Sequence, residues 1–190
     1  QFIFRTREFE QMEIEFFCNE SEEDKWMDYW IKERMEWYQS IGIDKKQLRL
    51  REHDESELAH YAKKTVDIEY LYPWGWGELE GIANRGSYDL HAHQESSGKD
   101  LTYFDSLDDK KYLPSVIEPA GGMTRTLFAL LLSVYEEEKL ENYETRTLFK
   151  FNFDIAPIQI GILPLSKKDD LIKVSEQINK TLNQNYRTEV

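Results

Sequence analysis

An alternating segment near the amino terminus, residues 5–17, constrains the fold more than any other part of the sequence. Its apolar side chains share one parity and its polar ones the other, a period of two that predicts a β-strand. The apolar face carries Met12, Ile14 and Phe16, and the opposite face carries Phe9, Gln11, Glu13 and Glu15. Because buried charges need partners, this acidic face is either a solvated sheet edge or the floor of a binding site.

Composition limits the remaining possibilities. The 190 residues are 40% hydrophobic, enough for one substantial core, or one domain plus part of another. The sequence shows no apolar run near the ~18 residues that a membrane span needs, and no leader of the signal-peptide type. The single cysteine, Cys18, excludes an intrachain disulfide and a Cys-rich zinc site. We therefore expect a cytoplasmic protein without membrane partners.

The net charge of −13 argues against a protein that binds nucleic acid through diffuse basic attraction. It does not exclude a protein that contacts RNA through local basic patches. The histidines give no metal signal either. His91 and His93 lie two positions apart on a predicted helix and so face apart, and His53 and His60 lack the spacing of a metal-binding helix.

Apolar periodicity predicts helices over residues 22–39, 53–64, 88–94, 126–139 and 168–182. The aromatic stripe of the first helix predicts core packing rather than base stacking. Gly121 and Gly122 are expected to end a strand, and Thr124 to cap the helix after it. Residues 96–113 are polar and acidic and predict a surface hairpin or loop.

Strands are predicted over residues 48–51, 65–71, 78–83, 114–118 and 155–165. The last run is apolar at both parities, as in a strand covered on both faces. Within 78–83, alternation places Glu78, Glu80 and Ile82 on one face and Leu79, Gly81 and Ala83 on the other. Gly81 suits either a local bulge or the close approach of a ligand.

Two further segments decide between the interpretations of the acidic strand. They are VIEPAGGMTR at residues 116–125 and WGWGELEGIANR at residues 74–85. With residues 5–17, they resemble motifs 2 and 3 and a central strand of the class II aminoacyl-tRNA synthetases, specifically the dimeric glycyl-tRNA synthetase family. The resemblance covers nearly the whole chain in order and spacing. It implies an α+β fold, with a class II synthetase-type antiparallel sheet flanked by helices in residues 1–151. The start of an α/β anticodon-binding domain would follow in residues 152–190.

The resemblance assigns an ATP site. Adenylate formation needs positioning and electrostatic stabilisation more than covalent chemistry, and guanidinium groups suit phosphate oxygens. It implies catalytic roles for Arg5 and Arg125 at the γ-phosphate, adenine stacking by Phe9, and a Mg²⁺ ligand in Glu78. The implied ATP contacts are Phe4, Arg5, Thr6, Arg7, Glu8, Phe9, Glu78, Leu79, Gly122, Met123, Thr124 and Arg125.

The resemblance also assigns a glycine site. Carboxylates of Glu13 and Glu118 would hold the ammonium group by their negative potential, although they are far apart in sequence. The implied glycine contacts are Phe9, Glu10, Gln11, Met12, Glu13, Glu118, Pro119, Ala120, Gly121 and Gly122. Arg85 and Asp89 also match family positions, but the sequence assigns them no role.

The sequence departs from the family at Ala120, where members commonly have serine. If that hydroxyl contacts the substrate, its loss costs about 0.5–1.5 kcal/mol. Motif 1 and the first strand of motif 2 would lie before Gln1. We therefore expect a piece of a longer, homodimeric protein that is catalytically incomplete by itself.

The function implied is a glycine–tRNA ligase, which uses ATP and Mg²⁺ to form glycyl-adenylate and transfers glycine to tRNA(Gly). One alternative is a synthetase-like binding or regulatory protein that has lost activation. The set of Arg5, Phe9, Glu13, Glu118 and Arg125 argues against it. A further alternative is an unrelated acidic α+β protein with accidental matches. Calorimetry with ATP and glycine discriminates between the ligase and the binding or regulatory protein.

Overall fold

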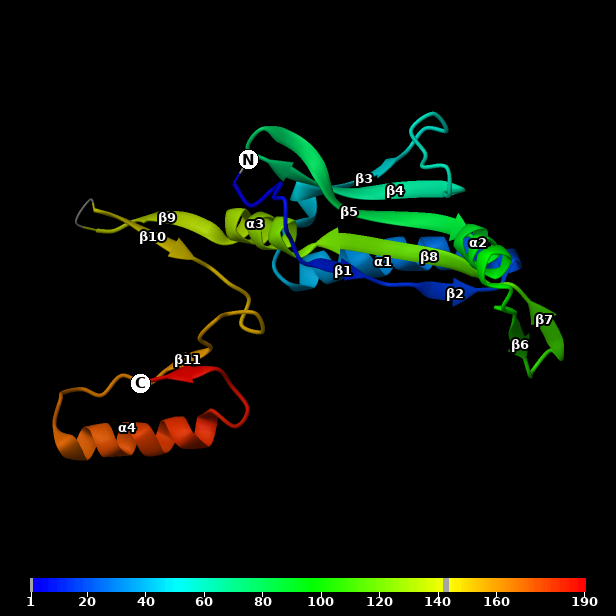
Figure 1. Ribbon diagram of the computed structural model, residues 1–190. Coiled ribbons are helices and arrows are strands. Elements are labelled where there is room, and N and C mark those ends of the chain that lie inside the picture. Colours follow the sequence, from blue (N-terminus) through cyan, green and yellow to red (C-terminus); the bar gives the residue numbers. More distant parts are fainter. Residues whose placement is uncertain (1, 142–143) are drawn as a thin grey trace.

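An antiparallel sheet organises the protein, as the computed structural model in Figure 1 shows. The structure describes residues 2–141 and 144–190, and within them six strands form this sheet in the order β1-β8-β5-β4-β3, with β2 also paired to β8. The strands are β1 (Gln11–Glu13), β2 (Phe16–Cys18), β3 (Leu48–Glu52), β4 (Lys64–Tyr72), β5 (Gly75–Gly86) and β8 (Ser115–Gly122). The expected α+β class is confirmed.

The predicted amino-terminal strand is confirmed, in two pieces along the same edge of β8. Gln11 pairs with Gly122 in β1, and Phe16 pairs with Ile117 in β2. Between them the Ile14 amide donates to the carbonyl of Pro119 (N···O 3.0 Å), so the segment follows β8 throughout. Its apolar parity is half-buried and its acidic parity is exposed.

Helix α1 (Glu23–Ser40) packs against one face of the sheet. Met27 and Tyr38 are buried, and the rings of Trp26 and Trp30 lie 4.6 and 5.5 Å from the Phe16 ring. The aromatic stripe therefore forms core, as its helical spacing predicts.

A buried ion pair joins α1 to the sheet. Glu80, in the middle of β5, has 1% of its surface exposed. It accepts hydrogen bonds from Arg34 (Nε to Oε1, 2.7 Å; Nη2 to Oε2, 2.9 Å) and from the Tyr38 hydroxyl (2.6 Å). A Cβ at Gly121 would lie 3.1 Å from Glu80 Oε2, so the absence of a side chain there leaves room for the carboxylate. The hydrogen bonds from Arg34 and Tyr38 compensate the desolvation of the Glu80 carboxylate.

A β-bulge at Leu79 corrects the predicted faces of β5. Glu78 pairs with Glu69 and Glu80 with Ile68, so Leu79 is the extra residue. A bulge inverts the alternation on one side of it. Glu78 therefore lies on the same face as Gly81 and Ala83, whereas Glu80 and Ile82 face α1, and the prediction that Glu78 shares the face of Glu80 is wrong.

The helix predicted for residues 53–64 is absent from the described chain, where residues 53–63 form a loop between β3 and β4. Tertiary contacts override its helical pattern. Arg51 donates from Nη2 to both oxygens of Glu57 (2.6 and 2.8 Å), and His53 Nε2 lies 2.7 Å from Asp67 Oδ2. These contacts tie the loop to the sheet.

The predicted helix over residues 126–139 is instead a helix and a strand. Helix α3 (Met123–Val134) follows β8 directly, and β9 (Tyr135–Lys139) pairs with β10 (Thr145–Phe149). Residues 136–138 are three consecutive glutamates. Ion pairs of Arg146 with Glu138 and of Lys150 with Glu136 (both 2.6 Å) stabilise them in a strand rather than a helix. The prediction that the two glycines end the strand is confirmed, because β8 ends at Gly122. The prediction that Thr124 caps the helix is wrong, because Gly122 is the N-cap of α3.

Helix α2 (Tyr88–Ser97) follows β5, and the predicted hairpin is confirmed as β6 (Tyr103–Asp105) and β7 (Lys110–Tyr112). The C-terminal unit contains β11 (Ile160–Gly161), the predicted helix α4 (Asp169–Leu182) and β12 (Thr188–Glu189), with β11 and β12 parallel. In Figure 1, α2 and the β6–β7 hairpin lie at one end of the sheet, and the C-terminal unit with α4 lies away from it. The predicted long strand over 155–165 is wrong, since Leu163 and Leu165 are 89% and 96% exposed. Two 3₁₀ turns, Glu20–Glu22 and Lys45–Gln47, complete the described elements.

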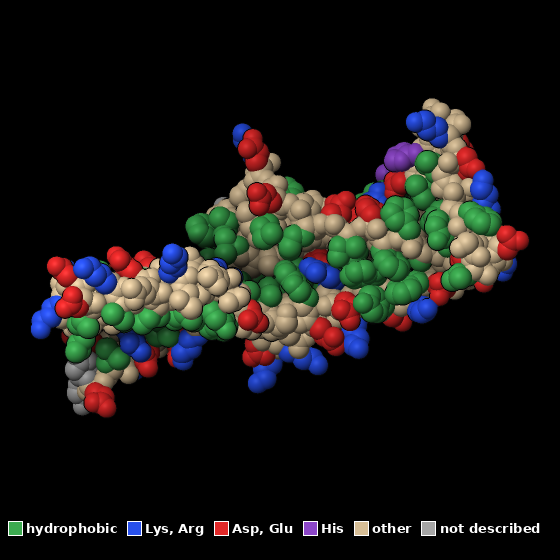
Figure 2. Space-filling model, turned by 90° about the horizontal axis from the view of Figure 1, so that it is seen from below, with side chains coloured by type: hydrophobic (Ala, Val, Ile, Leu, Met, Phe, Trp, Pro, Cys, Tyr) green, Lys and Arg blue, Asp and Glu red, His purple; other side chains and the backbone are tan. Residues whose placement is uncertain are grey.

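The surface mixes charged and apolar side chains. Figure 2 shows hydrophobic side chains gathered in patches between acidic and basic ones on the face seen from below. Among the described helices, none has the length and apolar character that crossing a bilayer requires.

Removing the Glu80 carboxylate is expected to destabilise the fold. Glu80→Ala leaves Arg34 largely buried without its partner, which lowers the free energy of unfolding by about 3 kcal/mol. Urea unfolding measures this change. Glu36→Ala is the control, since the Glu36–Lys32 pair (3.8 Å) is exposed and its loss should change the free energy by less than about 0.5 kcal/mol. Equal effects of the two substitutions would contradict the anchoring role of Glu80.

Candidate active site

A cavity of about 390 Å³ lies over the sheet face opposite α1. Its floor includes Gly81 on β5, which pairs with Asp67 of β4 on one side and with Ala120 of β8 on the other. Its walls come from the amino-terminal segment, the 53–63 loop and the start of α3. The lining residues are Phe4, Arg5, Thr6, Phe9, Gln11, His53, Glu57, Ala59, Tyr61, Thr65, Asp67, Glu78, Gly81, Ala83, Glu118, Ala120, Gly121, Gly122, Thr124 and Arg125.

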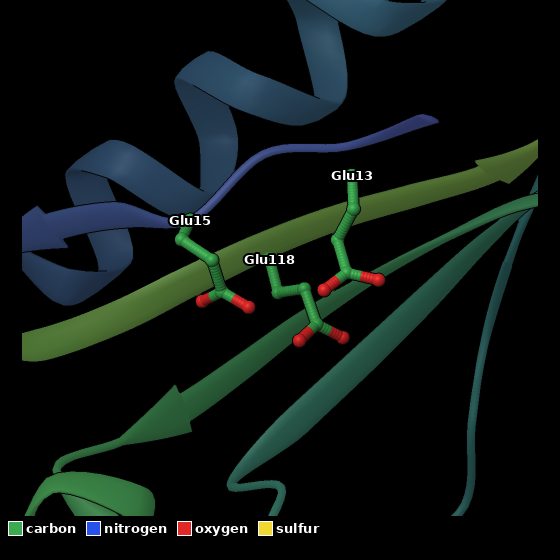
Figure 3. Close-up of side chains that lie close together, drawn as sticks. All are labelled: Glu13, Glu15 and Glu118. Carbon is green, nitrogen blue, oxygen red and sulfur yellow. The ribbon is translucent and has the colours of Figure 1, made fainter. Parts of the chain in front are cut away.

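Three carboxylates converge beside this cavity. Figure 3 shows Glu13, Glu15 and Glu118 pointing toward one another, and an oxygen from each lies within 4.8 Å of the others. The strand register explains the convergence, because Glu13 pairs with Ala120, two residues after Glu118 on β8. Gln11 donates from Nε2 to Glu13 Oε2 (2.6 Å). The structure thus brings together the two carboxylates that the sequence analysis placed around an ammonium group.

The pKa of Glu15 is raised by its surroundings in this cluster. Partial desolvation by the neighbouring protein raises the pKa from the ordinary value of 4.5 to about 7, with smaller contributions from a hydrogen bond to Glu118 and from the charges of Glu118 and Glu13. The positive charge of Arg85 acts in the opposite direction. The site therefore holds excess negative potential, which a bound cation would relieve.

Arg85 has a clear position in this site, where the sequence assigned it none. It is the extra residue of a second β-bulge, since Asn84 pairs with Ile117 and Gly86 with Val116. Its Nε donates to Asp89 Oδ2 (2.7 Å) and its Nη1 to Glu118 Oε2 (2.8 Å). The hydrogen bond to Asp89 is the main cause of its raised pKa. Arg85 thus orients Glu118, which lines the cavity.

Arg125 lies at the other end of the cavity. From the first turn of α3, its Nη1 contacts Glu78 Oε1 (3.0 Å) and its Nε donates to the Phe4 carbonyl (3.1 Å). Its guanidinium also lies over the Phe4 ring, 4.8 Å from the centroid. The Phe4 ring packs edge-on against Tyr72. A cationic group is thus fixed at the helix N-terminus, where anions are also favoured.

The other predicted ATP residues divide into two groups. Those that line the cavity are Arg5, Thr6, Phe9, Gly122 and Thr124, and Phe9 is 56% exposed there, as a stacking surface must be. Outside the lining are Arg7, Glu8 and Met123, which are exposed, and Leu79, which is 1% exposed in the core. The bulge at Leu79 turns its side chain away from the cavity.

The predicted glycine residues also divide into those that line the cavity and those that do not. Gln11, Glu118, Ala120, Gly121 and Gly122 line the cavity, together with Phe9, whereas Glu13 lies beside it. Met12 is half-buried and Pro119 is buried, both outside the lining. Glu10 accepts a hydrogen bond from the Met123 amide through its carbonyl (2.9 Å), which joins β1 to α3.

Sequence reasoning missed the wall formed by the 53–63 loop and β4, which includes His53, Glu57, Tyr61 and Asp67. The incorrect helix over 53–64 hid the loop residues. Asp67 carried a usable signal, since it alternates with the core residues Val66 and Ile68 and so lies on the opposite face of the sheet.

Comparison with known proteins agrees with this geometry. The chain belongs to the class II tRNA synthetase family, since the model of the "tRNA synthetase class II core domain (G, H, P, S and T)" matches residues 2–135. It is similar to curated proteins named glycine–tRNA ligase. That of Agathobacter rectalis is 52% identical over 97% of this chain and 41% of the relative. Those of Lachnospira eligens (48%) and Nocardia farcinica (45%) each match 99% of this chain and 40% and 42% of the relative.

The resemblance to class II synthetases is therefore confirmed. The chain spans about two fifths of the length of these curated relatives.

The Glu15 carboxyl is expected to titrate near pH 7, which carbon NMR of the glutamate carboxyls measures. A folded-state pKa raised from 4.5 to about 7 means that the folded protein binds this proton more tightly. As the pH rises from 4.5 to 7, the Glu15 contribution to the free energy of unfolding therefore decreases. Glu15→Gln removes this fall, so the variant gains stability relative to the parent over that range. A midpoint below pH 5 would contradict the described carboxylate cluster.

Proposed function

We propose that this chain forms the glycine-activating site of a glycine–tRNA ligase. The observation that carries the proposal is one cavity lined by Glu118, with Glu13 within 4.8 Å of Glu118 outside the lining, and by Arg125 at the other end. An amino acid presents an ammonium group, and a nucleotide presents phosphates, so opposite charges are needed at the two ends. The similarity to glycine–tRNA ligases selects the amino acid.

In the proposed reaction, a glycine carboxylate oxygen attacks the α-phosphorus of ATP, the bond to the β-phosphate breaks and pyrophosphate leaves. Glu13 and Glu118 hold the ammonium group and so orient the carboxylate. Arg5 and Arg125 contact the terminal phosphate and offset its charge, while Phe9 stacks on adenine. Such positioning supplies much of the rate of phosphoryl-type transfers.

Magnesium is part of the proposal through Glu78. Mg²⁺ uses one or two carboxylates plus phosphate oxygens and water. Glu78 suits this role because its side chain is 52% exposed, lines the cavity and contacts Arg125 through one oxygen only. Its second oxygen would hold the ion, which offsets phosphate charge when bound.

The remaining parts of the proposal extend the resemblance to the glycyl-tRNA synthetase family. The glycyl group would pass to tRNA(Gly), in a cytoplasmic homodimer. Residues 152–190 would begin an α/β anticodon-binding domain after a catalytic core in residues 1–151. The parallel pairing of β11 and β12 around α4 supports an α/β unit, because parallel neighbouring strands need such a crossover.

Amino-acid-dependent exchange of pyrophosphate into ATP tests the function. The enzyme to use is the natural full-length polypeptide that contains residues 1–190, with glycine, alanine and serine as substrates. We expect exchange with glycine at least a hundredfold above the other two. Exchange that prefers another amino acid would overturn the glycine assignment. Failure of calorimetry to detect ATP binding would instead favour the alternative of a binding protein without activation.

Neutralising Glu118 should weaken glycine binding selectively. Glu118→Gln removes a charged acceptor, and hydrogen bonds to charged groups contribute about 1.5–3 kcal/mol, so the KM for glycine should rise about tenfold to a hundredfold. The KM for ATP should change less than about threefold. Exposed Glu176→Gln on α4 is the matched control. Equal increases in both KM values would contradict an ammonium contact.

A further inference from the structure

The Arg85 guanidinium is held on its two edges and on one face. The edges contact Asp89 and Glu118, as described above. The face lies on the ring of Tyr61, whose centroid is 4.1 Å from Arg85 Cζ. Tyr61 belongs to the 53–63 loop and lines the cavity. None of the sequence motifs assigned it a role.

We propose that Tyr61 is a positioning residue for glycine binding, which holds Arg85 by a cation–π contact and through Arg85 fixes the Glu118 carboxylate. This inference rests on the proposed function. It extends the site from the strands that carry the motifs to the loop that closes one wall of the cavity.

The two edge contacts alone leave the Arg85 guanidinium one rotational degree of freedom. A guanidinium bonded at two edges can still tilt about the line that joins those contacts, because hydrogen bonds to carboxylates tolerate a broad range of angles. A ring against its face removes this tilt. An arginine over an aromatic face at about this distance is also attracted by the ring quadrupole.

The backbone keeps Tyr61 in register with Arg85. The Lys63 amide donates to the carbonyl of Asn84 (2.7 Å), the residue before Arg85, and the Ala62 amide donates to the Ala59 carbonyl (2.9 Å). The neighbouring His60 ring packs against Tyr88, at the start of α2. The loop is thus tied to β5 and α2, the two elements that carry Arg85 and Asp89.

Glu118 needs such support because Arg85 is its cationic partner, whereas the other two members of the cluster are carboxylates. Glu13 and Glu15 both lie within 4.8 Å of Glu118, measured between carboxylate oxygens. If Arg85 tilts, it retains Asp89, an i,i+4 neighbour in sequence, and releases Glu118. The released carboxylate moves away from the other two, and the ammonium group loses one of its acceptors. The loss falls on glycine and leaves ATP unaffected.

The test compares Tyr61→Leu with Tyr61→Phe in pyrophosphate exchange by the natural full-length polypeptide. Leucine removes the ring and phenylalanine keeps it. We expect Tyr61→Leu to raise the KM for glycine about three- to tenfold, the range of a cation–π contact, with the KM for ATP unchanged. Tyr61→Phe should restore the parent value. Tyr103→Leu, at an exposed aromatic on the β6–β7 hairpin outside the cavity lining, is the control and should leave both KM values unchanged.

Arg85→Lys keeps the experiment decisive if Tyr61→Leu lowers the melting temperature. Lysine keeps the charge but has no planar face, so adding Tyr61→Leu to Arg85→Lys should raise the KM for glycine no further than Arg85→Lys alone. If the parent shows glycine-dependent exchange and Tyr61→Leu leaves the KM for glycine unchanged, this inference alone is overturned. The same holds if Tyr61→Phe does not keep the parent KM for glycine. No glycine-dependent exchange by the parent overturns the proposed function and the inference together.

Discussion

The antiparallel pairing of β8 with two neighbours is the constraint on which the site depends. On one side β1 sets Glu13 opposite Ala120, and on the other β5 sets Ala83 opposite Glu118. Side chains that share a face of adjacent strands are about 5 Å apart. Registered pairing therefore brings carboxylates from distant parts of the sequence into one cluster, which no local interaction could achieve.

The same pairing must withstand repulsion within that cluster. Desolvation is the main cause of the raised pKa of Glu15, and the charges of Glu118 and Glu13 add to it. Arg85 offsets part of the repulsion at one edge of the cluster. Beneath the sheet, the buried pair of Glu80 with Arg34 fixes the strands from the opposite face. The protein thus holds a site that is unfavourable when empty and suited to a cation.

Much of this arrangement could be predicted from the sequence. Alternation gave the acidic face of the amino-terminal strand, and helical spacing gave α1 and α4. The misses share one cause, which is tertiary context. The bulge at Leu79 inverts the face of Glu78 through pairing with β4, and the 53–63 loop is held by contacts such as His53 with Asp67. The loop's own pattern is helical and points to the wrong structure, so Tyr61 could not be placed from the sequence, whereas alternation in β4 does place Asp67 on the cavity face.

A structure of the natural full-length polypeptide with a non-hydrolysable analogue of glycyl-adenylate tests the central claim most directly. The quantity to measure is the distance from the ammonium nitrogen to the carboxylate oxygens of Glu13 and Glu118. The account predicts contacts of about 2.7–3.2 Å to both, with the phosphate on the Arg125 side of the cavity. An ammonium group without contact to either carboxylate would contradict the account.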